Sequence, residues 1–203
     1  MMKKITLLFV LALAATTGYT QSLGVKAGAT YTTFTGNDTR DYEYRVGYTA
    51  GLVLQRHITD LIGVQLEALY TAKGAKTASK SGSNEVEESF RLNYVDVPVL
   101  FHVSAGGLFF DLGPQASFIA KASQVREVTS GSTTTSSKTD ITDHPYTIDF
   151  GYAAGIGYRA DNGLGLELRY NGGLKKVDDE GPFAGRERRN AGFGLMLSYF
   201  VGR

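Results

Sequence analysis

Apolar and polar positions alternate with a period of two along most of the chain. The stretch 163–170, GLGLELRY, is the clearest case, with leucine and tyrosine on one face and glycine, glutamate and arginine on the other. Such alternation is typical of a β-strand whose two faces meet different surroundings. The pattern alone allows the apolar face to be buried in a soluble sheet or to contact lipid in a membrane barrel.

Eight segments of this kind follow one another in the sequence. A tilted strand needs about 9 to 11 residues to cross a bilayer, and each segment is long enough to do so. Their even number and similar length predict an all-β fold, an eight-stranded antiparallel up-and-down transmembrane β-barrel. We expect the strands at 22–34, 44–56, 61–75, 89–103, 107–122, 145–160, 163–174 and 189–201.

The links between these segments alternate between short and long. The links after the second, fourth and sixth segments are HITD, SAGG and DN, whereas the other four are long and polar. With the N-terminus in the periplasm, this predicts short periplasmic turns, long extracellular loops and both termini in the periplasm. The low-complexity stretch 129–139, TSGSTTTSSKT, is expected to be a solvated, mobile loop, or alternatively to contact a partner outside the cell.

The two faces of the predicted strands differ in composition. One face is almost wholly apolar, and the other combines glycine with charges of both signs. Side chains fill the interior of an eight-stranded barrel, where an unpaired charge is costly. We therefore expect the leucines to face lipid and the charges to pair in the lumen as a structural network, with an ion path as the alternative. The expected lumen charges are Lys26, Arg45, Glu67, Asp96, Asp111, Asp149, Arg159, Glu167 and Arg169.

The N-terminus and the overall charge narrow the class of protein. The basic start MMKK and the apolar run ITLLFVLALAA predict a signal peptide over 1–20, which leaves a single barrel domain over 21–203. Without Lys3 and Lys4, 19 basic residues face 20 acidic ones, so nothing argues for nucleic acid as a partner. The chain has no cysteine, which excludes disulfides and a lipid anchor on cysteine.

Few residues could carry out chemistry. Of the three histidines, neither His57 nor His144 has a second ligand at metal spacing, and we expect no metal site and no cofactor. His102 and Ser104 could form a base and nucleophile pair, with a spacing similar to that of outer-membrane lipid A deacylases. We expect no catalytic residue and no enzyme, and we keep two alternatives: a soluble lipocalin-like barrel that binds a ligand inside, and an outer-membrane lipid hydrolase.

Three stretches resemble one known family. LGVKAGATYTTF at 23–34, LNYVDVPVLFHV at 92–103 and FFDLGPQASF at 109–118 are similar to the PorT-like outer-membrane β-barrel proteins of Bacteroidetes. The resemblance spans the predicted mature chain. It implies a structural or interaction role at the cell surface, possible assistance to protein secretion, and two partners: the outer-membrane bilayer and, during biogenesis, the barrel-assembly machinery.

Overall fold

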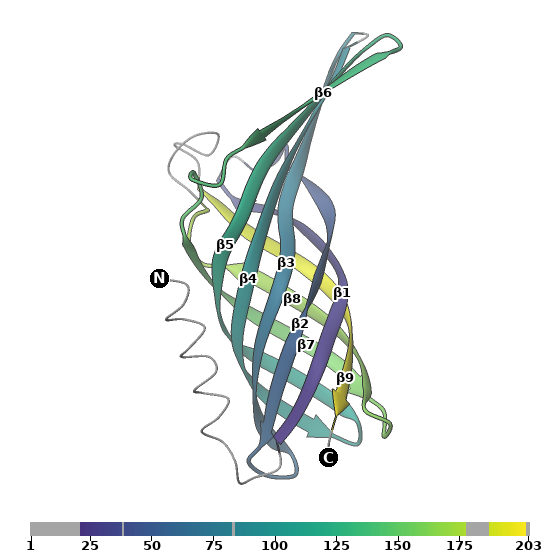
Figure 1. Cartoon of the computed structure of the whole chain (residues 1–203), viewed down its shortest axis with the longest axis vertical. Helices are drawn as coiled ribbons and strands as arrows, with labels where there is room; N and C mark the ends of the chain where they lie inside the picture. The colour runs from purple at the N-terminus through teal and green to yellow at the C-terminus, as the bar shows by residue number, and fades with distance from the viewer. Residues whose placement is uncertain (1–20, 38, 83, 178–186, 202–203) are drawn as a thin grey trace.

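The computed structural model describes residues 21–37, 39–82, 84–177 and 187–201, and the predicted signal peptide lies outside these residues. Antiparallel strands make up almost all of the described chain (Figure 1). Within it, no helix is long and apolar enough to cross a membrane. The strands are β1 (Gln21–Gly36), β2 (Glu43–His57), β3 (Ile62–Ser81), β4 (Asn84–Ala105), β5 (Leu108–Ser130), β6 (Thr133–Asp140), β7 (Ile148–Arg159), β8 (Leu164–Gly173) and β9 (Arg188–Val201).

Eight of these strands close into a ring. The order is β1, β2, β3, β4, β5, β7, β8 and β9, and β9 pairs antiparallel with β1 from Leu23↔Val201 to Gly36↔Arg188. β6 pairs with the far end of β5 and takes no part in closure. The predicted eight-stranded antiparallel barrel is thus confirmed, and a closed ring leaves no unpaired strand edge within its wall.

The apolar face of the barrel wall points outward. On β8, Leu164, Leu166 and Leu168 are about half exposed, at 51%, 49% and 53%, whereas Glu167 and Arg169 are 1% exposed. A lipocalin-like barrel requires the opposite arrangement, with its apolar face inside. That alternative is therefore wrong for this chain.

The two ends of the barrel differ in length. Short turns join β2 to β3, β4 to β5 and β7 to β8 at one end, whereas β3, β4, β5 and β6 extend far beyond the ring at the other (Figure 1). We call this extension, residues 76–89 and 123–140, the projecting sheet. The stretch 76–88 was expected to be a loop and is instead the β3–β4 hairpin.

The Ser/Thr-rich stretch 129–139 was expected to be a mobile loop and is instead the end of β5, a turn and most of β6. All eight residues of β6 are exposed, so the backbone ladder with β5 holds this strand in place. Periodicity gives no signal for such a strand, because both of its faces are polar.

The lumen is filled in layers along the barrel axis. The inward side chains of β1 show the order from the short-turn end: Lys26 lies among other charges, Thr30 and Thr32 line a small polar cavity, and Phe34 belongs to an apolar cluster. We call this last group the apolar plug. It consists of Phe34, Ala75, Phe90, Leu92, Tyr94, Ala122, Ile141 and Val177.

Candidate functional site

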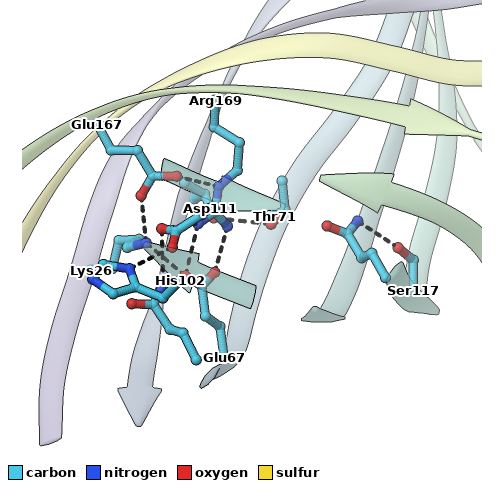
Figure 2. A network of polar contacts seen from close by, with 11 residues as sticks. Lys26, Glu67, Thr71, His102, Asp111, Ser117, Glu167 and Arg169 are labelled. Carbon is cyan, nitrogen blue, oxygen red and sulfur yellow. Dashed lines mark hydrogen bonds and ion pairs between the residues drawn. The ribbon is translucent and has the colours of Figure 1, made fainter. Parts of the chain in front are cut away.

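The most highly charged part of the lumen is an ion cluster built from four strands. β1 contributes Lys26, β3 contributes Glu67, β5 contributes Asp111, and β8 contributes Glu167 and Arg169. Figure 2 shows these side chains pointing toward one another inside the barrel. Each of the five is at most 3% exposed, so the charges are shielded from solvent.

Glu67 and Glu167 share the same two cations. The Lys26 ammonium lies 2.6 Å from Glu67 Oε1 and 2.6 Å from Glu167 Oε2. The Arg169 guanidinium donates two hydrogen bonds to Glu67, at 2.5 and 2.8 Å, and its Nε donates to Glu167 at 2.5 Å. Bidentate, charge-assisted contacts of this kind fix geometry as well as adding energy. The cluster therefore ties β1, β3 and β8 together across the lumen.

Asp111 extends the cluster toward the short-turn end. Its Oδ2 lies 4.0 Å from Arg169 and accepts a hydrogen bond from Gln65 at 3.3 Å, while Oδ1 lies 2.7 Å from His102 Nδ1. The three carboxylates of the cluster thus contact Lys26, Arg169 and the His102 ring.

Gly155 makes room for the long side chains of this cluster. A Cβ atom placed on it would lie 2.3 Å from Glu167 Oε1. A side chain at this point of β7 would therefore displace the Glu167 carboxylate from its contacts with Lys26 and Arg169. The alternation of glycine with charge in the sequence has a steric reason here.

A second polar group lies nearer the plug. Lys73 donates to Asp96 at 2.8 Å and to Ser117 at 3.2 Å, and its ammonium lies 4.9 Å from the centre of the Tyr94 ring. The expected lumen set did not include Lys73. It shares the odd-numbered face of β3 with Gln65 and Glu67, and this parity in the sequence could have revealed it.

The other expected lumen charges lie outside the ion cluster. Asp149 accepts a hydrogen bond from Asn190 at 3.0 Å. Arg159, near the short turns, donates to Gln55 at 2.6 Å. Half-buried Arg45 donates to the Lys73 carbonyl at 3.2 Å, in a part of β2 where the pairing register with β3 shifts. The nine residues are therefore distributed over several separate groups.

The end with short turns contains a cavity of about 270 Å³. Both residues of the hydrolase alternative, His102 and Ser104, line it, together with His57 and Arg159. Asp111 is the acid that contacts His102, a partner that sequence reasoning could not assign. No group of three or more His, Asp or Glu side chains in the described part of the chain could hold a metal ion.

Comparison with known protein families agrees with this architecture. The model of the outer membrane protein beta-barrel domain matches residues 20–179. The chain belongs to this outer-membrane β-barrel family. Its place is therefore the outer membrane, where the exposed leucines of β8 meet lipid. No curated protein matches the sequence.

Several solved outer-membrane barrels are similar to the chain at low identity. Neisserial surface protein A is 15% identical, with a TM-score of 0.48 over 87% of this chain and 96% of the other. The attachment invasion locus protein Ail of Yersinia pestis is 11% identical, with a TM-score of 0.45 over 91% and 100%. The N-terminal barrel domain of Pseudomonas aeruginosa OprF is 12% identical, with a TM-score of 0.41 over 91% and 99%.

Proposed function

We propose that this protein is a non-enzymatic outer-membrane barrel of the PorT-like type that presents the projecting sheet to partners at the cell surface. The observation that carries the proposal is the projecting sheet itself, in which four strands extend beyond the ring (Figure 1). Among the strands that the structure describes, none pairs with the outer edge of β6, and all residues of β6 are exposed. An open edge of this kind can add an extended strand from another protein through backbone hydrogen bonds.

The filled lumen supports an interaction role over a transport role. The ion cluster and the apolar plug follow one another along the axis, and Lys26 and Arg169 of the cluster are paired with Glu67 and Glu167. An eight-stranded barrel is just wide enough for side chains to fill it. The lumen charges accordingly serve as a structural network.

The proposal includes an orientation in the membrane. The projecting sheet faces the outside, the short turns and both termini face the periplasm, and 1–20 is removed as a signal peptide before the barrel-assembly machinery inserts the chain. Outer-membrane barrels generally have short periplasmic turns and longer extracellular loops, which supports this arrangement. The PorT-like resemblance supports assistance to protein secretion as the process served.

Cysteine labelling of intact cells tests the orientation, because the natural chain has no cysteine. Ser136→Cys, on β6, should react with a maleimide that cannot cross the outer membrane. Asp60→Cys, in the exposed turn between β2 and β3, is the matched control and should react only after lysis. Labelling of Asp60→Cys alone on intact cells would reverse the orientation and remove the projecting sheet from the cell surface.

A photo-crosslinking residue tests the interaction role. Placed at Ser136 in the native host, it should give a discrete cross-linked protein, whereas the same residue at Asp60 should not give that product. If Ser136 gives no product while the barrel is correctly assembled and oriented, β6 does not meet a partner.

A further inference from the structure

A small polar cavity lies between the ion cluster and the apolar plug. Its volume of about 20 Å³ is enough for one particle the size of a water molecule. The inward faces of six strands contribute to it, among them Thr30 and Thr32 of β1, Lys73 of β3, Asp149 of β7 and Asn190 of β9.

Two buried oxygen atoms of the cavity lining lack a hydrogen-bond partner. Asp149 is 4% exposed and Asn190 is 5% exposed, and the Asn190 amide donates to Asp149 Oδ2 at 3.0 Å. Asp149 Oδ1 and Asn190 Oδ1 have no partner in the part of the chain that the structure describes. A buried acceptor without a partner costs about 1 to 3 kcal/mol, and more when it is charged.

The charges around the cavity do not balance. The Lys73 ammonium contacts Asp96 at 2.8 Å, which neutralises that pair. Among the described ion pairs none includes Asp149, so an ionised Asp149 carboxylate would leave this layer with one negative charge. A water molecule could donate to both oxygens, but it would leave this charge uncompensated.

We propose that the cavity binds one alkali-metal cation, Na⁺ or K⁺, through Asp149 Oδ1 and Asn190 Oδ1. Thr30 adds a third oxygen ligand, because its hydroxyl proton is donated to the carbonyl of Ala72 and its oxygen lone pairs stay available. Thr32 also lines the cavity, but its hydroxyl donates to the Gly74 carbonyl and accepts from the Gly74 N–H. Carboxylate, amide and hydroxyl oxygens are ligands for hard cations. A divalent ion would replace the single negative charge by a buried positive one, so the site favours a monovalent ion.

The bound cation joins β1, β7 and β9 above the ion cluster. It therefore stabilises the barrel at a level along the axis that the contacts of Lys26 and Arg169 do not reach. The plug closes the layer above, so the cation is held in place and does not pass through the lumen.

Anomalous diffraction on the full barrel locates the cation directly. Crystals grown with Rb⁺ or Tl⁺ in place of Na⁺ and K⁺ should show an anomalous peak within contact distance of Asp149 Oδ1 and Asn190 Oδ1. A cavity that contains only density for water, with no anomalous signal, would overturn the proposal. This measurement uses the natural sequence and does not depend on whether a variant folds.

Thermal unfolding provides the functional readout. At constant ionic strength, replacing choline chloride by KCl or NaCl should raise the unfolding midpoint by about 2 °C or more, because a ligand that binds only the folded state stabilises it. Asp149→Asn keeps the shape of the side chain and should lose this rise, whereas Asp60→Asn, which removes a charge from an exposed turn, should keep it. An equal midpoint in choline and alkali salts for the natural sequence would refute the site.

Discussion

At the scale of single residues, Leu166 tests which face meets lipid. It is 49% exposed and is the third residue of β8, on the face opposite Glu167. Leu166→Arg should lower the free energy of unfolding in lipid by up to about 2 to 4 kcal/mol, because arginine on the lipid face costs this much at the bilayer centre and less toward the membrane surface. Urea titration of the reconstituted barrel measures this, with Leu164→Arg, nearer the membrane surface, as a milder control. Equal stability of Leu166→Arg and the natural sequence would place this face in water.

Glu67 tests the ion cluster at the same scale. Glu67→Gln removes the charge that faces Lys26 and Arg169, both of which are fully buried. Breaking a buried ion pair from one side typically costs about 3 to 5 kcal/mol, so unfolding should require correspondingly less denaturant. Glu85→Gln is the matched control, because its contact with Lys80 is exposed and should contribute less than about 1 kcal/mol. Similar effects for the two variants would mean that the cluster does not stabilise the barrel.

The alternation of inward and outward positions along each strand predicted much of this lumen, and the contacts that it did not predict have a physical explanation. Glu67, Glu167 and Arg169 alternate with apolar residues that face lipid, so period two places them inside. This alternation gives no distances across the barrel, however, so it could not show that Arg159 and Asp149 lie apart from the ion cluster. Those separations depend on the register of strands far apart in the sequence.

At the scale of elements, the membrane explains which strands were predictable. The wall segments, such as β8, have one apolar face because lipid requires it, and the sequence shows them as alternation. The ends of β3, β4 and β5 and all of β6 leave the bilayer, where no apolar face is needed. Backbone hydrogen bonds between the strands hold the projecting sheet together instead, and exposed cross-strand pairs such as Lys76 with Glu87, at 2.9 Å, add little. Such pairs have no periodic signature, so these strands were expected to be loops.

The projecting sheet should be separable from the barrel. Removing Val128 and Thr129 together with their partners Thr135 and Thr134 shortens the β5–β6 hairpin and keeps its turn and register. The change lies outside the ring, so the free energy of unfolding should stay within about 0.5 kcal/mol of the natural value. Denaturant titration and the mobility shift on boiling in SDS check this. Loss of the shift would show that the hairpin is needed for closure.

At the scale of the whole molecule, two closures in series predict a barrel that does not conduct. The ion cluster fills the lumen around Arg169, and the apolar plug around Phe90 fills it again nearer the projecting sheet. In planar bilayers the natural protein should give no steady current above that of the bare membrane.

The variant Glu67→Ala tests the second closure alone. It weakens the ion cluster but leaves the plug intact, so it should still give no steady current if it folds. The buried apolar side chains of the plug stay in place in this variant, and moving an ion into such surroundings is costly. Steady single-channel steps from the natural protein would contradict the closed lumen. Steps from Glu67→Ala alone would show that the ion cluster, and not the plug, closes the barrel.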